Sequence, residues 1–199
     1  KCNVYGVSIK WWSLTHWYTI LQYIESTGTQ YIDTQMIVWS WSSIDIKFYW
    51  WDIPFWAREL WNRRSFSLNQ SNGFYAFNFW NISQAKPLTT TIPLIPEDWH
   101  VCTIKNNWYA TVDEWGTKFT VPAFAAKWNL VLFWLNNNWA IVTSTGMKIA
   151  YCNIQEWNEL RKYIPAKRNI DWKIWLYDEA NDVFYTNAGS GEFIPWPKI

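Results

Sequence analysis

Glycine, histidine and cysteine are all scarce in this chain. Its 199 residues include seven glycines, three cysteines and two histidines. Cys2, Cys102 and Cys152 form no Cys-x-x-Cys pair, and His16 and His100 are far apart, so neither set has the close spacing of a zinc site. We therefore predict no metal site and no cofactor. Cys102 and Cys152 lie on predicted strands and are compatible with one disulfide, although we favour buried free thiols.

The chain also lacks excess charge and long apolar runs. It has 17 basic and 16 acidic residues, a net charge of +1, and its basic runs are as short as "NRR" and "AKR". We therefore expect no nucleic-acid partner. No stretch approaches the roughly 18 apolar residues of a membrane span, so we expect no membrane insertion. The first residue is Lys1 rather than Met, so we interpret the chain as a fragment, and the lack of a signal peptide says little about its compartment.

Helical periodicity is nearly absent, and short alternating or apolar runs recur instead. In "SSIDIKFYW", Ile44, Ile46 and Phe48 alternate with Asp45 and Lys47, as in a half-buried strand. Further strands are predicted at "GFYAFNF", "WHVCTIK", "YATVD", "KFTV", "NLVLFWL", "MKIAYCNI" and "DVFYT". By contrast, "PLTTTIPLIPED" is predicted to be a crossing loop and "PAFAAK" a single helical turn. This spacing predicts an all-β fold, a two-sheet antiparallel sandwich.

Tryptophan is abundant, and it stands at places where glycine is usual. The chain has 20 tryptophans, and Trp80, Trp108, Trp139 and Trp157 occupy turn-like segments such as "KNNWYATV" and "LNNNWAIV". Tryptophan disfavours positive φ and leaves a large apolar ring in water at such places. Glycine at the same positions gives ordinary turns.

Four segments, taken in order, carry a resemblance to a known family. They are "YTILQYIESTGTQYIDT", "FWARELWNRRSFSLNQSNGFYAF", "EDWHVCTIKNNWYATVD" and the closing "MKIAYCNIQEWNELRKYIPAKRNIDWKIWLYDEANDVFYTNAGSGEF". Together they resemble the concanavalin A-like (laminin-G-like jelly-roll) domain of bacterial surface and phage tail proteins. The resemblance covers residues 18–199 and implies a jelly-roll β-sandwich there, with residues 1–17 as a linker or the end of a preceding domain. It also implies an extracellular, cell-surface or virion location.

The chain departs from this family at glycine positions, where it has Trp56, Trp139, Trp157 and Trp175. Some bacteria read the UGA codon as glycine, whereas a common translation table reads it as tryptophan. We favour the hypothesis that many of these tryptophans stand for glycines. The alternative is a genuinely Trp-rich protein, such as an aromatic carbohydrate binder. Trp99, in the Trp-His motif of a predicted strand, is the best candidate for a genuine tryptophan.

No arrangement of residues predicts catalysis. Sandwich glycosidases of this superfold need paired carboxylates, and the pattern Glu-x-Asp-x-x-Glu does not occur. The acidic pairs Asp113–Glu114 and Asp178–Glu179 lie at predicted turns, where solvated carboxylates are the simpler interpretation. Asp178 and Asp182 lack the density of oxygen ligands that a calcium loop has. We therefore predict no catalytic residue and no metal ligand.

Binding is the function that remains. Lectin-like jelly rolls stack aromatic faces on sugars and flank them with Asn, Asp and Arg. Residues 55–79 supply the best candidate carbohydrate-binding set: Arg58, Asn62, Arg64, Tyr75 and Asn78. Packing on the sheet face and at the edge of the core is at least as good an interpretation of Arg58 and Tyr75. We hypothesise a non-catalytic recognition or adhesion module of a larger secreted, surface or virion protein, with a glycan or a host or cell surface as partner. The alternatives are a structural spacer or assembly domain without a small ligand and, more distantly, a glycoside hydrolase.

Overall fold

The computed structural model describes residues 17–39, 41–49, 54–58, 65–71, 74–79, 88–93, 98–105, 109–112, 119–120, 126, 129–137, 140–143 and 145–197. Most of these residues belong to β-strands, and every strand pairing is antiparallel. The strands are β1 (Tyr18–Thr27), β2 (Ile32–Ile37), β3 (Ser43–Tyr49), β4 (Phe55–Arg58), β5 (Ser65–Ser71), β6 (Phe74–Phe79), β7 (Leu88–Pro93), β8 (Trp99–Lys105), β9 (Tyr109–Val112), β10 (Phe119–Thr120), β11 (Asn129–Leu132), β12 (Trp134–Asn137), β13 (Ala140–Thr143), β14 (Thr145–Glu156), β15 (Glu159–Arg168), β16 (Ile174–Asp178), β17 (Val183–Tyr185) and β18 (Ile194–Pro197).

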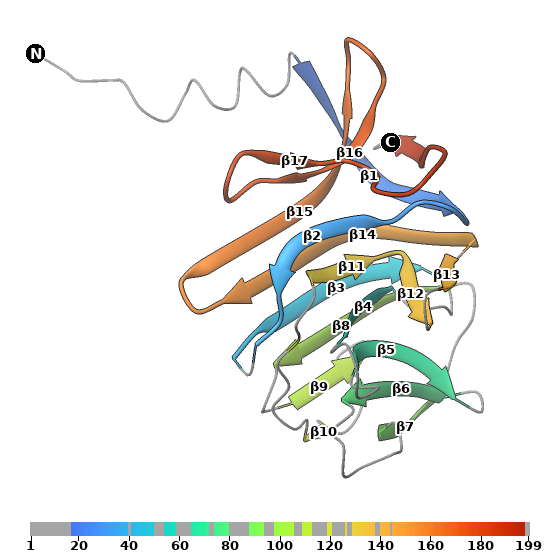
Figure 1. Cartoon of the computed structure of the whole chain (residues 1–199), viewed down its shortest axis with the longest axis vertical. Coiled ribbons are helices and arrows are strands. Elements are labelled where there is room, and N and C mark those ends of the chain that lie inside the picture. The colour runs from blue at the N-terminus through green and yellow to red at the C-terminus, as the bar shows by residue number, and fades with distance from the viewer. Residues whose placement is uncertain are drawn as a thin grey trace, which may run out of the picture.

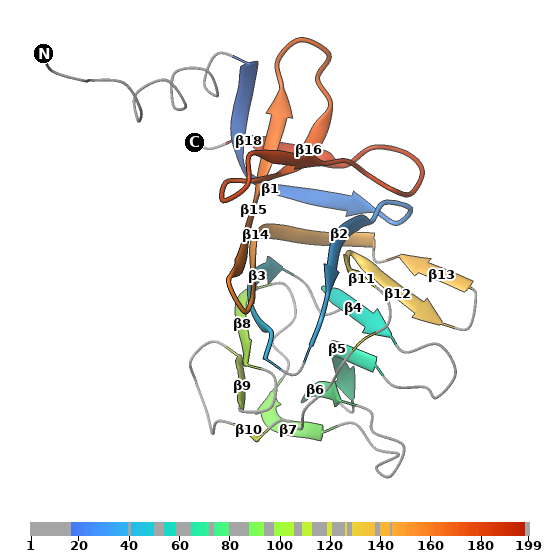
Figure 2. The ribbon, with the colours of Figure 1, turned by 60° about the vertical axis from the view of Figure 1, so that its left-hand side comes forward.

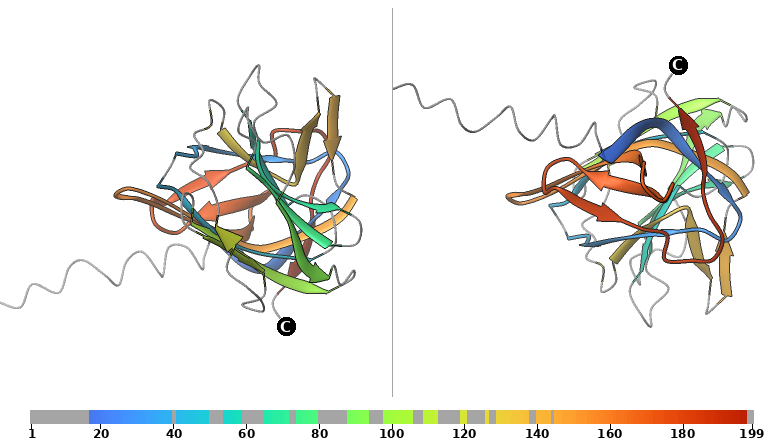
Figure 3. Two further views of the ribbon diagram at one scale, coloured as in Figure 1. Left: turned by 90° about the horizontal axis from the view of Figure 1, so that it is seen from below. Right: turned by 90° about the horizontal axis from the view of Figure 1, so that it is seen from above.

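Two large sheets make up a sandwich (Figures 1 and 2). The larger sheet has the order β10-β9-β8-β3-β14-β1-β15-β16-β17, and the smaller has the order β2-β11-β4-β5-β6-β7. The strands β12 and β13 form a separate hairpin. Seen from above (Figure 3, right), β18 lies beside β1, with which it pairs, so the end of the described chain joins its beginning. The predicted all-β, two-sheet antiparallel sandwich is confirmed.

The core follows from the alternation that the sequence shows along β3. Ile44, Ile46 and Phe48 are fully buried, whereas Asp45 and Lys47 are only partly buried. Both neighbouring strands repeat this pattern, because directly paired residues share a face of the sheet. The described residues contain no helix long and apolar enough to cross a membrane.

The two described cysteines are buried free thiols. Cys102 on β8 and Cys152 on β14 both pair with Ile46, from opposite sides of β3. Neighbouring strands lie about 4.8 Å apart, so the two Cα atoms are separated by about 9.6 Å. A disulfide allows at most about 7 Å, which excludes a Cys102–Cys152 bridge. Burial also raises the pKa of the Cys152 thiol, which keeps it protonated and unreactive.

Two predicted segments differ from the structure. The predicted crossing loop contains β7, in which Pro93 pairs with Phe74. Because β7 is an edge strand, its proline need not donate a hydrogen bond to a second neighbour. The run "NLVLFWL" is two strands rather than one, since the buried Phe133 has a φ of 66° and separates β11 from β12. The helical turn predicted at residues 122–127 lies outside the described residues except for Ala126.

Candidate functional site

The residues predicted to bind carbohydrate belong to the smaller sheet or lie outside the described part of the chain. Arg58 lies on β4, and Tyr75 and Asn78 lie on β6, two strands away. Only the backbone of these three residues is described, and Asn62 and Arg64 lie outside the described residues. This carbohydrate site therefore stays a prediction.

A row of paired residues crosses the outer face of the larger sheet. Glu25 on β1 pairs with Lys148 on β14, Lys148 pairs with Tyr49 on β3, and Tyr49 pairs with Trp99 on β8. Phe48, the neighbour of Tyr49, is buried in the core, so the row faces outward. The four strands lie side by side in Figures 1 and 2.

Aromatic rings gather along this row. Tyr23 lies two positions before Glu25 on β1, and its ring centroid is 5.2 Å from that of Trp99. The Tyr49 and Trp99 centroids are 5.6 Å apart, and in both pairs the rings meet edge to face at 63°. On the other side of Tyr23, Trp196 of β18 stacks at 5.4 Å. Such edge-to-face and offset contacts are the favoured geometries of aromatic pairs. We call Tyr23, Tyr49, Trp99 and Trp196 the aromatic patch.

The ammonium of Lys148 lies among these rings. Its Nζ is 4.2 Å from the centroid of Tyr49, 5.4 Å from that of Tyr23 and 5.9 Å from that of Trp196. It also lies 4.0 Å from Glu25 Oε2, which accepts a hydrogen bond from Trp196 Nε1 at 3.0 Å. Burial, together with the negative charge of Glu25, raises the pKa of Tyr23. The Tyr23 phenol is therefore a neutral hydroxyl near neutral pH, able both to donate and to accept.

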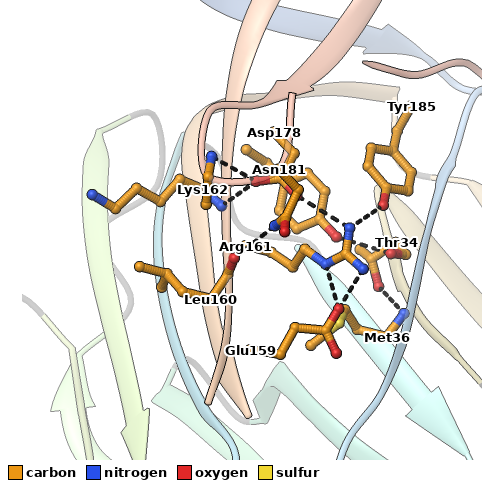
Figure 4. A network of polar contacts seen from close by, with 11 residues as sticks. Thr34, Met36, Glu159, Leu160, Arg161, Lys162, Asp178, Asn181 and Tyr185 are labelled. Carbon is orange, nitrogen blue, oxygen red and sulfur yellow. Dashed lines mark hydrogen bonds and ion pairs between the residues drawn. The ribbon is translucent and has the colours of Figure 1, made fainter. Parts of the chain in front are cut away.

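A second cluster, around Asp178, stabilises the fold (Figure 4). The Asp178 carboxylate is fully buried and accepts a hydrogen bond from Arg161 Nη1 at 3.2 Å. Its other donors are the backbone N–H of Lys162 at 2.9 Å, the backbone N–H of Ala180 at 3.1 Å and Asn181 Nδ2 at 2.8 Å. Each oxygen thus has two donors, and the carboxylate anchors the β16–β17 hairpin to β15. Asp182 accepts a hydrogen bond from the Tyr177 hydroxyl. Among the described residues, no group of three His, Cys, Asp or Glu side chains is placed to hold a metal ion.

A buried carboxylate lies at the far end of β14 from the aromatic patch. The Ser42 hydroxyl donates to Glu156 Oε2, whereas Glu156 Oε1 has no hydrogen-bond partner. The glycosidase mechanism needs two carboxylates facing one scissile bond. Glu159, which pairs with Glu156 across the hairpin, is engaged by Arg161. Glu156 alone therefore gives no support to hydrolysis.

Two tryptophans occupy turns that favour glycine. Trp157 has a φ of 46° and Trp172 a φ of 64°, and their side chains are 72% and 70% exposed. Trp157 is the first of the two residues between Glu156 and Glu159, where a hairpin with positive φ prefers glycine. Trp175, in contrast, lies in β16 and packs its ring against Phe184 at 4.8 Å. Trp139 and the side chain of Trp56 lie outside the described residues. We therefore assign no binding role to Trp157 or Trp172.

A comparison with protein-family models gives no match, and no curated protein sequence matches the chain. The interpretation of the site therefore rests on its own geometry. Trp99, the best candidate for a genuine tryptophan in the sequence, lies in a regular strand and contacts both Tyr23 and Tyr49 of the aromatic patch. Sequence reasoning missed the rest of the patch, because its residues come from four strands, β1, β3, β8 and β18, that only the register brings together. The alternation in "SSIDIKFYW" was the one available signal, since it places Tyr49 on the outer face.

Proposed function

We propose that this domain is a non-catalytic recognition module that binds glycans on its aromatic patch. The observation that carries the proposal is the contact of Tyr23 and Tyr49 with Trp99 on the outer face of the larger sheet. Aromatic side chains present a flat apolar surface together with a polar edge, and this combination suits the C–H faces and hydroxyls of a sugar ring. The wider role is recognition or adhesion within a larger secreted, surface or virion protein built on a jelly-roll domain.

The position of the rings on paired strands supports this function. A binding group held on regular elements loses little conformational entropy when its ligand arrives. Trp99, Tyr49, Lys148 and Glu25 are fixed by direct cross-strand pairing rather than by loops. Polar groups border the rings, namely the Glu25 carboxylate and the Lys148 ammonium. The patch thus combines apolar faces with hydrogen-bonding groups on one rigid surface.

A glycan array probed with the full chain tests this proposal. We expect binding to a subset of glycans, and we expect Trp99→Ala to weaken that binding by at least about tenfold, the effect of losing one good aromatic contact. Trp17→Ala is the matched control, because Trp17 is an exposed tryptophan that precedes β1 and is not part of the patch. Arg58→Ala tests the predicted site on the smaller sheet. Loss of binding in Arg58→Ala alone would move the site there, and a flat array would reject glycan binding.

One observation favours the structural alternative, an assembly or spacer domain. Trp17 is 52% exposed and Ile170 is 72% exposed, and the Asn169 N–H donates to the Trp17 carbonyl, so the two apolar side chains lie on the same end of the molecule. Exposed apolar side chains that cluster mark interfaces between proteins. Light scattering of the wild-type chain and of Ile170→Asp checks this alternative. The structural alternative predicts that the wild-type chain forms an assembly and that Ile170→Asp is monomeric.

A further inference from the structure

We propose that the ligand of the aromatic patch is an acidic glycan, and that Lys47 recognises its carboxylate or sulfate group. This inference rests on the proposed function and narrows it to a class of ligand. Lys47 lies on β3, two positions before Tyr49, and therefore faces outward on the same strand. Its Nζ is 5.6 Å from the ring centroid of Trp99. A sugar stacked on Trp99 thus places its substituents within reach of this ammonium.

The two lysines beside the aromatic patch, Lys47 and Lys148, differ in their counter-charges. Lys148 already has Glu25 as a carboxylate partner at 4.0 Å and is surrounded by aromatic rings. Lys47 has no carboxylate partner among the described residues. The positive charge available to a ligand is therefore that of Lys47.

The neighbours of Lys47 do not neutralise it. Lys47 pairs with Val101 on β8 and with Tyr151 on β14, both of which are uncharged near neutral pH. The nearest carboxylate along β3 belongs to Asp45, which accepts hydrogen bonds from Thr103 Oγ1 at 3.3 Å and from Asn153 Nδ2 at 3.4 Å. These hydrogen bonds direct the Asp45 carboxylate towards β8 and β14, and it forms no ion pair with Lys47.

An anionic ligand group gains more at this position than a hydroxyl does. Lys47 is already half-buried, and a sugar that covers Trp99 removes more water from its ammonium. A hydrogen bond between an ammonium and a carboxylate is about twice as strong as one between neutral groups. A neutral glycan desolvates the ammonium without offering it a counter-charge. The patch therefore discriminates against neutral glycans as well as attracting acidic ones.

Titration calorimetry with matched oligosaccharides tests the assignment. The probes are a β-1,4-glucan hexasaccharide, the same oligosaccharide oxidised at C6 to glucuronate, and its 6-O-sulfated form. We expect the wild-type chain to bind the acidic probes about tenfold more tightly than the neutral one, as a charge-assisted contact predicts. Lys47→Gln should abolish this advantage by weakening the binding of the acidic probes and tightening that of the neutral one, because the neutral probe no longer desolvates an ammonium. Lys162→Gln, which removes an exposed lysine on β15, is the control and should change neither affinity.

The outcomes separate this inference from the proposed function. Loss of the advantage for both acidic probes in Lys47→Gln supports it, and loss for one probe alone assigns the anion as carboxylate or sulfate. Equal wild-type binding of neutral and acidic probes overturns the inference but leaves glycan binding in place. An acidic preference that survives Lys47→Gln overturns it in the same way. If none of the probes binds and the glycan array is flat, both the inference and the proposed function fail.

Discussion

Asn187 accepts the backbone N–H of Tyr31 through its Oδ1 atom at 3.1 Å, which ties the last loop of the domain to the β1–β2 hairpin. The backbone repeats this connection, because Ala188 N–H donates to the Tyr31 carbonyl and Ser190 N–H donates to the Thr29 carbonyl. The motif "NAGSG" near the end of the chain and "STGTQ" near its beginning thus fit together. We call this contact the terminal clasp.

Replacing Gly189 should break the terminal clasp. A Cβ at this position would lie 2.1 Å from the Thr29 carbonyl oxygen, a backbone atom, so the backbone itself would have to shift. We expect Gly189→Ala to lower the free energy of unfolding by about 2 kcal/mol or more, as overpacking against backbone does. Urea denaturation measures the change. Ser190→Ala is the control and should stay within about 0.5 kcal/mol of the wild type. A Gly189→Ala variant as stable as the wild type would contradict the clasp.

The Asp178 cluster predicts a second stability effect. Arg161 is the cationic donor to the buried Asp178 carboxylate, and it also donates to the Tyr185 hydroxyl at 2.7 Å. Removing it in Arg161→Met leaves a buried charge without its cation, at a cost of about 2 kcal/mol or more. Lys162→Met, a neighbour with an exposed side chain, should cost little. In a double-mutant cycle with Asp178→Asn, purely additive effects would show that the pair is not coupled.

The turn between β15 and β16 predicts a pH dependence. Arg168 Nε donates to Asp171 Oδ1 at 2.7 Å, and this hydrogen bond lowers the pKa of Asp171 to about 2. Because the folded pKa lies below the unfolded value of about 3.9, the stabilisation is complete above that value and disappears as the pH falls through about 2. Carbon-detected NMR of the carboxyl group measures the titration. Arg168→Gln should return the pKa towards 3.9, and a wild-type carboxyl that already titrates there would rule out the contact.

Local patterns were enough to predict the sandwich but not the details of its chain path. Ile44, Ile46 and Phe48 alternate with polar residues, and this period alone specifies a strand with one buried face. The left-handed turn at Phe133 was not predictable, because it depends on distant partners. Its N–H donates to the Pro54 carbonyl, and its ring lies 4.9 Å from that of Phe193.

The aromatic patch shows the same limit. Glu25, Lys148, Tyr49 and Trp99 are spread over most of the chain, and no local spacing relates them. Their proximity follows from the strand order β1-β14-β3-β8, which places the early strands β1 and β3 beside the later strands β8 and β14. Sequence pattern gives which face of each strand is polar, whereas register decides which of those polar residues meet.

Trp157 and Trp172 provide the last prediction, since both are held in a conformation that costs a residue with a side chain about 1 kcal/mol or more. Trp157 has a φ of 46° and Trp172 a φ of 64°. Glycine removes this strain and also withdraws two exposed rings from water. We expect Trp157→Gly and Trp172→Gly each to raise the free energy of unfolding by about 1 kcal/mol, measured by urea denaturation.

Trp99→Gly is the matched control for these two variants. Trp99 is the first residue of β8, has no positive φ and packs on Tyr23 and Tyr49, so glycine there should destabilise the domain by about 2 kcal/mol or more. If Trp157 and Trp172 stand for glycines and Trp99 is a genuine tryptophan, glycine should raise the free energy of unfolding at the two turn positions and lower it at position 99. The codons decide the matter independently: UGA at positions 157 and 172 with UGG at position 99 supports the glycine hypothesis, and UGG at all three rejects it. The codon at position 196 also decides whether Trp196 belongs to the natural binding surface. A UGA codon there would remove Trp196 from the aromatic patch and leave Tyr23, Tyr49 and Trp99 to bind the ligand.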